Sequence, residues 1–302
     1  MVVFTGACDA SGAVPIDERL FALADDEDNV LRIYDADRGG APVSATDISP
    51  RLGLAKKKKW PESDLEAATR VGDRALWLSS HARSKKGKLK PDRFRFFATD
   101  VPGAGRETEL RGVPYLDLLR DLLAEPQLKA FGLAEAAERP PQAEGGLNIE
   151  GMTAMPDGAV LLGFRNPVPK GRALLVPVRN PLAPFAGEAL HFGAPIDLNL
   201  GGLGVRALSF WHGKYLIAAG HYGDGGAHRL YSWSGPGAHP ALLPDAVPAD
   251  VNPEAFFTPE ERDELLVLSD DGTRVIDGLP CKELDDASQK RFRGVWLRSI
   301  DP

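Results

Sequence analysis

The chain has 302 residues, a formal net charge of −7, 43% hydrophobic residues and two cysteines. No apolar run approaches the roughly 18 residues of a membrane-spanning helix, and the N-terminal MVVF lacks the apolar segment of a signal peptide. These features exclude a membrane protein and predict a cytoplasmic one, or a periplasmic one if a leader has been removed. The acidic balance argues against nucleic acid as a partner. Cys8 and Cys281 lie outside any CxxC motif, and we expect both thiols to be reduced and structural.

One motif recurs five times along the chain. Each copy opens with a charged residue followed by Ala or Gly, and an apolar segment then ends in a polar residue 15 or 16 positions later. The opening residues are Asp9, Glu66, Glu150, Arg206 and Glu254, and the closing residues are Asp25, His81, Arg165, His221 and Asp270. Turn signals such as PDG at 156–158 lie between the opening and the closing residue, so each copy of the motif predicts a β-hairpin.

Further strands follow each hairpin. Third strands are expected at 29–35, 93–100, 172–178, 228–234 and 273–277, and weaker fourth strands at 42–48, 107–111, 188–192 and 293–299. Four antiparallel strands repeated about every 50 to 60 residues are typical of β-propeller blades. We therefore predict an all-β protein, a single propeller domain over 1–302 with five four-stranded blades. The N-terminal VVFT is expected to pair with the last blade and close the ring.

One interval between copies is longer than the others. The segment from Glu66 to Glu150 contains leucines at helical spacing, Leu116, Leu119, Leu122 and Leu123. We predict a helical insertion over about 113–144, between the second and third blades, that caps one face of the ring.

The repeated charges are expected to meet at one end of the propeller. Adjacent antiparallel strands place the start of the first strand beside the end of the second, and the first strand of a blade is innermost. The opening residues should therefore form an inner circle at the mouth of the central channel, with the closing residues just outside it. A mouth lined by ionisable groups is a candidate ligand site. Alternatively, the repeated charges hold neighbouring blades together.

The residue types at this mouth favour a cation and an anionic ligand. Several carboxylates around one opening repel one another unless a cation compensates, and their hard oxygens favour Ca²⁺, Mg²⁺ or Mn²⁺. The expected metal ligands are Glu66, Glu150, Glu254, Asp9, Asp25 and Asp270. Arg165 and Arg206, with Asn166, are expected to bind an anionic substrate, because guanidinium groups match phosphate or carboxylate. His81 and His221 are the expected proton-transfer residues.

Two charged runs near this mouth allow a second interpretation. The basic stretch ARSKKGKLK at 82–90 follows His81 on the same rim and either attracts an anionic ligand or is a solvated loop. The run DDEDN at 25–29 has the composition of a calcium loop, but it lacks the spacing of an EF-hand, which favours an ordinary turn.

Several segments together resemble a bacterial family known as domain of unknown function 3616. They are CDASGAV (8–14), ADDEDNVLRIYD (24–35), SDLEAA (63–68), SSHARSKKGK (79–88), NIEGM (148–152), GFRNP (163–167), GGLGVRAL (201–208) and LSDDG (268–272). The resemblance implies a propeller and a bacterial source. That family is similar in fold to esterase-like phytase and other phytase-like propellers, a likeness that implies no activity by itself.

Two functions remain open from the sequence. The first is a metal-dependent hydrolase that acts on a small anionic ester, most simply a phosphoester, at the channel mouth. The second is a non-catalytic propeller that binds a protein partner or a small ligand on the same rim. In either case we expect a monomer.

Overall fold

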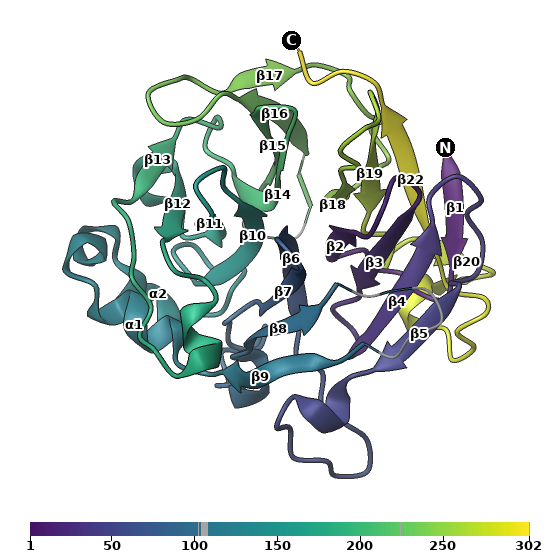
Figure 1. The fold of residues 1–302 in the computed structure, drawn as a ribbon, viewed down its shortest axis with the longest axis horizontal. Coiled ribbons are helices and arrows are strands. Elements are labelled where there is room, and N and C mark those ends of the chain that lie inside the picture. The colour runs from purple at the N-terminus through teal and green to yellow at the C-terminus, as the bar shows by residue number, and fades with distance from the viewer. Residues whose placement is uncertain (102, 104–107, 224, 227, 302) are drawn as a thin grey trace.

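Five four-stranded antiparallel sheets surround a common axis in the computed structural model, which describes residues 1–101, 103, 108–223, 225–226 and 228–301. Figure 1 looks along this axis and shows the five blades in chain order around the ring. The predicted all-β propeller with five four-stranded blades is confirmed. In four blades the strands follow chain order from the centre outward, and the innermost strands contact one another around the channel.

The first four blades each use four consecutive strands. Blade 1 contains β2 (Gly12–Pro15), β3 (Leu20–Ala24), β4 (Val30–Asp35) and β5 (Ser44–Asp47). Blade 2 contains β6 (Leu65–Val71), β7 (Arg74–Ser79), β8 (Phe96–Asp100) and β9 (Leu110–Tyr115). Blade 3 contains β10 (Asn148–Ala154), β11 (Val160–Asn166), β12 (Ala173–Val178) and β13 (Ile196–Leu198). Blade 4 contains β14 (Gly204–Trp211), β15 (Lys214–Gly220), β16 (Arg229–Trp233) and β17 (Ala241–Leu243).

The fifth blade combines the two ends of the chain. It contains β18 (Pro253–Phe257), β19 (Leu265–Ser269), β22 (Arg291–Leu297) and β1 (Val2–Thr5), with β1 paired to β22 as its outer strand. The predicted closure of the ring by the N-terminal strand is therefore confirmed. Phe4 of β1 stacks on Phe292 of β22 at a ring-centroid distance of 4.9 Å and also contacts Phe21 and Tyr34 of blade 1, so the closing strand packs within its own blade and against blade 1.

Three of the expected outer strands are placed differently. Residues 273–277 do not form the third strand of the fifth blade, because β20 (Val275–Ile276) pairs only with β21 (Leu279–Pro280) in a separate hairpin. The segment 293–299, which was expected to form a fourth strand, lies mostly in β22 instead, the third strand of the fifth blade. In blade 3 the fourth strand is β13 and not 188–192, where only Phe192 forms an isolated bridge. Glu107, expected to open the fourth strand of blade 2, lies outside the described residues.

Hydroxyl side chains join the inner strands of neighbouring blades. Thr69 Oγ1 accepts a hydrogen bond of 2.8 Å from Ala154 N, and Thr153 Oγ1 accepts one of 2.8 Å from Phe210 N. Ser209 Oγ lies 3.1 Å from Thr258 Oγ1. These contacts link blades 2, 3, 4 and 5 in sequence, and the two threonine acceptors also satisfy the backbone donors of Ala154 and Phe210.

Helices occupy the long connection between blades 2 and 3. They are α1 (Leu118–Ala124), a 3₁₀ segment (Pro126–Phe131) and α2 (Leu133–Ala137), and the predicted helical insertion is confirmed. Its first expected residues belong instead to β9, which continues to Tyr115. Leu118 and Leu122 are buried in the core shared by blades 2 and 3. No helix among the described residues is long and apolar enough to cross a membrane.

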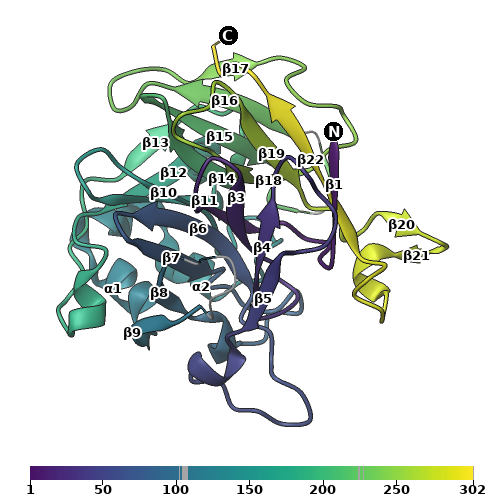
Figure 2. The same cartoon turned by 45° about the vertical axis from the view of Figure 1, so that its right-hand side comes forward.

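The two cysteines form a disulfide, so the expectation of reduced thiols is wrong. Cys8 and Cys281 are bonded with their Cα atoms 5.9 Å apart, although 273 positions separate them in sequence. Closure of the ring brings the segment that enters blade 1 next to the loop that precedes β22. This loop carries the β20–β21 hairpin, which extends away from the ring in Figure 2. Cys8 and Cys281 form a small apolar cluster there with Ile276 and Leu284.

Candidate functional site

A cavity of about 1190 Å³ opens at the end of the channel where the first strands begin. All five residues of the predicted inner circle line it, namely Asp9, Glu66, Glu150, Arg206 and Glu254. From the predicted outer circle, Arg165 and Asp270 also line it. The repeated motif thus places its charges in one cavity, as the antiparallel geometry of the blades requires.

Four inner-circle residues lie at β-bulges. The pairing of the first and second strands shifts register across Glu66 in β6, Glu150 in β10, Arg206 in β14 and Glu254 in β18. A bulge inserts an unpaired residue and redirects its side chain. The same local irregularity in four blades therefore turns a charged side chain toward the channel, and it explains why the charge recurs at this position of each repeat.

Three glutamates from three blades converge in the mouth. Glu66, Glu150 and Glu254 each offer a carboxylate oxygen within 4.8 Å of the others, and all three are buried. Burial, together with repulsion from neighbouring carboxylates such as Glu150, raises the pKa of Glu66 well above its usual range. Burial likewise raises the pKa of Glu254, although Arg206 opposes the shift.

Glu150 is the most enclosed of these three glutamates. Its Oε1 accepts hydrogen bonds of 2.7 Å from Arg165 Nη1 and of 2.7 Å from Asn148 Nδ2. Its Oε2 is buried and has no hydrogen-bond partner among the described residues. A buried carboxylate oxygen without a partner is costly, and a bound cation or donor at this point would remove that cost.

The guanidinium groups of the two predicted substrate-binding arginines bind to other groups of the protein. Arg206 Nη2 forms an ion pair with Glu254 Oε1 and lies 3.7 Å from Asp270 Oδ2. Arg165 Nε donates to the carbonyl of His221 at 3.1 Å, and its Nη2 donates to the carbonyl of Gly223 at 3.3 Å. Together with the Arg165–Glu150 pair, these contacts balance part of the negative charge in the mouth. Asn166 does not line the cavity, because its Nδ2 donates to Pro141 O and Ala143 O at 2.7 Å each.

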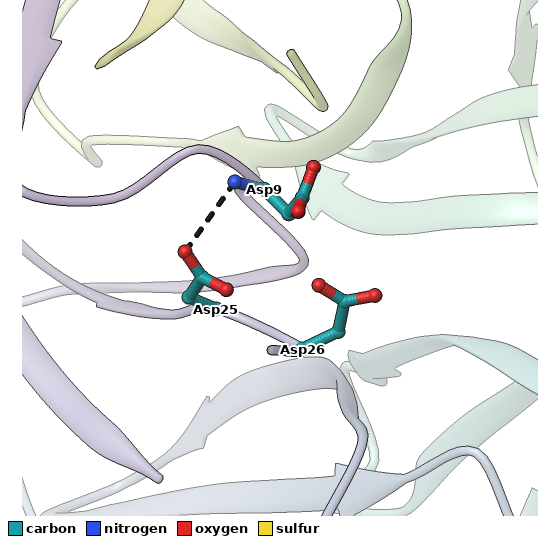
Figure 3. Close-up of side chains that lie close together, drawn as sticks. All are labelled: Asp9, Asp25 and Asp26. Carbon is teal, nitrogen blue, oxygen red and sulfur yellow. Dashed lines mark hydrogen bonds between the residues drawn. The ribbon is translucent and has the colours of Figure 1, made fainter. Parts of the chain in front are cut away.

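A second group of carboxylates continues from the glutamates toward blade 1. Asp9, Asp25 and Asp26 form one triad, and Asp26, Asp64 and Glu66 form another, each with oxygens within 4.8 Å. Figure 3 shows Asp9 and Asp26 extending into the same space, whereas Asp25 turns to the backbone of Asp9. Asp25 Oδ2 accepts from Cys8 N at 3.1 Å and from Asp9 N at 3.4 Å. Asp25 therefore holds the loop, and it does not line the cavity.

These aspartates differ in their pKa values. Burial raises the pKa of Asp9 and Asp26, and it raises those of Asp25 and Asp64 to about 6. Burial alone would also raise the pKa of Asp270, but hydrogen bonding with Asp9 and Glu254, the charge of Arg206 and a hydrogen bond of 2.9 Å from Gly272 N hold it below its usual range. The pKa values of Asp9 and Asp270 are thus shifted in opposite directions, upward for Asp9 and downward for Asp270.

The histidines are placed differently from the prediction. His81 is buried outside the cavity, with Nδ1 2.8 Å from Ser79 O and its ring against Phe94. Burial lowers the pKa of His81 to about 4. His221 is exposed and does not line the cavity either. His228 does line it, and burial together with Arg206 lowers its pKa to about 4.

Sequence reasoning missed several residues of this cavity, among them Asp26, Asp64 and His228. Asp26 lay in the acidic run that was interpreted as an ordinary turn. Asp64 was visible two positions before Glu66, and His228 opened the third strand of its repeat. The position of each residue relative to the repeated motif could therefore have indicated that it lies at the channel mouth.

Basic residues surround the acidic floor of the cavity. The loop between β7 and β8 contributes Lys85, Lys86, Lys88, Lys90 and Arg93, and the loop after β19 contributes Arg274 and Lys282. Arg93 forms ion pairs with Glu62 and, at 2.9 Å, with Asp64. The cavity therefore combines buried carboxylates at its base with a positive rim.

Comparisons with known proteins give a family match over part of the chain and distant structural likenesses. Residues 109–242 match the family described as "Protein of unknown function (DUF3616)", which confirms the predicted resemblance in that part of the chain. No curated protein matches the sequence. Similar solved structures include a PQQ-bound aldose sugar dehydrogenase from Streptomyces coelicolor, with 13% identity, a TM-score of 0.48 and coverage of 99% of this chain and 96% of that one. A glutaminyl cyclase from Myxococcus xanthus has 12% identity, a TM-score of 0.45 and coverage of 98% and 95%. Likenesses at this level carry no argument about the activity of this chain.

Proposed function

We propose that this protein, whose residues 109–242 match a family of unknown function, is a divalent-cation-dependent hydrolase of a small anionic ester, most simply a phosphoester. The observation that carries the proposal is the convergence of the Glu66, Glu150 and Glu254 carboxylates in the mouth, where the buried Oε2 of Glu150 has no hydrogen-bond partner among the described residues. Carboxylate oxygens from three rigid blades suit Ca²⁺, Mg²⁺ or Mn²⁺.

The chemistry of the donors fits a hard cation. Glu66 forms no ion pair with any described residue, and Arg206 opposes the raised pKa of Glu254. A cation at the three glutamates would favour their ionised forms and remove the repulsion among them. When bound there, it would supply Lewis-acid polarisation of an ester oxygen.

The residues around the glutamates would bind and orient the ester. The lysines of the loop between β7 and β8, together with Lys282, attract an anion to the cavity. His228 lines the same cavity as a neutral imidazole, because its pKa is about 4, and it can accept a proton from the attacking water. The oxygen of water would bond to phosphorus, and the bond from phosphorus to the ester oxygen would break as the alcohol leaves with a proton.

A specific observation supports a second candidate, a propeller that binds an anionic ligand without hydrolysing it. Arg165 and Arg206 are engaged by Glu150 and Glu254, so internal ion pairs neutralise part of the ring. Under this alternative the cation and the basic rim bind the ligand, but no group transfers a proton.

Paired measurements test both candidates. Calorimetric titration with Ca²⁺, Mg²⁺ and Mn²⁺ should detect a site that Glu66→Gln weakens at least about tenfold, since this variant removes a ligand charge. Glu62→Gln is the matched control, because Glu62 lines the same cavity but pairs with Arg93. Cation-dependent hydrolysis of 4-nitrophenyl phosphate or other phosphoesters supports the hydrolase. Ligand binding without turnover supports the second candidate, and absence of cation binding would refute both.

The disulfide between Cys8 and Cys281 indicates the cellular compartment in which the protein works. We infer that the protein works in an oxidising compartment such as a periplasm, because disulfides persist there and are rare in a reducing cytosol. Thiol alkylation of freshly lysed native cells, followed by mass measurement, tests this inference. Unmodified, bonded cysteines support it, and fully alkylated Cys8 and Cys281 would contradict it.

A further inference from the structure

A second cavity of about 710 Å³ occupies the other end of the channel. It is lined where the inner strands end, by Thr69 of β6, Ala154 of β10, Phe210 of β14 and Phe256 of β18. Small-molecule sites usually have volumes of about 300 to 1,000 Å³. This cavity therefore has the size of a ligand site, and it lies at the opposite end from the basic rim.

The walls of the second cavity combine apolar and polar side chains. The apolar residues include Ala13, Ala68, Met155, Leu208, Phe210 and Ala255. Four of the hydroxyl side chains, Thr69, Thr153, Ser209 and Thr258, are engaged in the hydrogen bonds that join neighbouring blades. The apolar part of the wall thus offers hydrocarbon contact to the body of a ligand.

The charges of the second cavity are predominantly negative. Glu150 and Glu254 line it as well as the mouth, and Asp73 and Glu260 line its outer part. Its arginine, Arg70, donates to the carbonyls of Gly72 at 2.9 Å and of Ile16 at 3.2 Å. His212 Nε2 lies 3.1 Å from the carbonyl oxygen of Glu260. Within the described part of the chain, the basic groups of this cavity are therefore directed at backbone oxygens, while two glutamates lie at its inner end.

We propose that this second cavity binds a small amphipathic amine, with an apolar or aromatic body and one protonated amino group. The ammonium group would donate to Glu150 Oε2, which is buried and has no partner in the described structure. The apolar body would contact the alanines and Phe210. A carboxylate ligand is repelled by the acidic inner end, and a neutral analogue lacks the charge-assisted hydrogen bond. This inference goes beyond the proposed function, because the body of the amine would lie at the opposite end of the channel. The two sites share Glu150, so a bound cation and the ammonium group would compete for its Oε2.

Ligand charge provides a test that needs no variant. Phenethylamine, 2-phenylethanol and 3-phenylpropionate share an aromatic body and differ in charge, and each can be titrated into the intact protein in the presence of EDTA. Binding can be followed by calorimetry and by the fluorescence of Trp211, which lines the cavity. We expect phenethylamine to bind at least about tenfold more tightly than either analogue. Equal binding of the three probes, or no binding of the amine, would overturn the proposal.

Three variants separate this site from the cation site. Ala68→Leu fills the second cavity and should weaken phenethylamine binding at least about tenfold while leaving cation binding within about twofold. Glu66→Gln should do the opposite, because Glu66 lines the mouth and not the second cavity. Glu150→Gln should weaken both, since Glu150 lines both cavities.

The outcomes distinguish the two proposals. If the protein binds phenethylamine but no cation, the proposed function fails and the amine site stands. If Ala68→Leu keeps its thermal stability and binds phenethylamine as tightly as the natural chain, the amine site is refuted whatever the cation does.

Discussion

The disulfide between Cys8 and Cys281 should account for a large share of the stability of the folded ring. The perturbation is the double replacement Cys8→Ser and Cys281→Ser, which removes the bond without leaving an unpaired thiol. The bond joins residues 273 positions apart, so it closes most of the chain into one loop. Loop-closure entropy for that length corresponds to about 5 to 6 kcal/mol in the unfolded state.

Apolar contacts around the disulfide contribute little of the stability that is lost when the bond is removed. The apolar cluster around it contains only Ile276 and Leu284 besides the two cysteines. We therefore expect a loss of about 5 kcal/mol in the free energy of unfolding, and a fall in Tm of roughly 10 °C.

Urea unfolding followed by circular dichroism measures this loss. The natural chain should unfold at lower urea concentration when a reducing agent is added, whereas the double variant should not respond to the reducing agent. The slope of free energy against urea should rise in the reduced protein, because an unfolded chain without the cross-link exposes more surface. A loss below about 1 kcal/mol would refute the entropic reasoning.

Three further predictions concern other parts of the ring. His81→Asn retains a residue that tolerates its left-handed backbone (φ 55°) and removes the imidazole. Because the folded pKa of His81 is about 4 against 6.5 unfolded, its contribution to stability is present above pH 6.5 and lost as pH falls toward 4. Between pH 6.5 and 4 the free energy of unfolding of the natural chain should therefore fall by about 3 kcal/mol more than that of the variant, as measured by urea unfolding at several pH values. The same dependence of the free energy on pH in both proteins would contradict the lowered pKa of His81. Thr153→Val leaves Phe210 N without its acceptor and should cost about 1 to 3 kcal/mol, whereas Thr46→Val on the outer strand of blade 1 should cost less. Phe4→Ala removes a buried ring between blades 1 and 5 and should cost about 3 to 5 kcal/mol by the same measurement, and a cost below 1 kcal/mol would show that closure does not depend on that ring.

The sequence predicted the inner circle well because its signal is local and repeated. A charged residue followed by a small one recurs at the start of each first strand, and hairpin geometry then fixes the end of the channel at which it lies. The bulges at Glu66, Glu150, Arg206 and Glu254 were not visible, since a register shift depends on how two strands pair. These bulges nevertheless lie at four of the five residues predicted for the inner circle.

The outer positions were harder to predict because they depend on contacts between blades. His81 and His221 occupy corresponding places in the repeat, yet one is buried beside Phe94 and the other is exposed. Asp26 joins the cavity because two triads of carboxylates share it, a proximity that arises only when blades 1 and 2 are adjacent. The disulfide was missed for the same reason, since closure of the ring, and not sequence spacing, brings its cysteines together.

The pairing of β1 with β22 also sets an order of events during synthesis. Val2–Thr5 are made well before their partner strand, Arg291–Leu297, which lies near the other end of the described chain. Until then the first strand has no neighbour in its sheet, and the fifth blade lacks its outer edge. A prematurely terminated chain therefore exposes unpaired strand edges, which are prone to aggregate or to attract proteases. Closure by the N-terminal strand thus completes the ring only after β22 has been made.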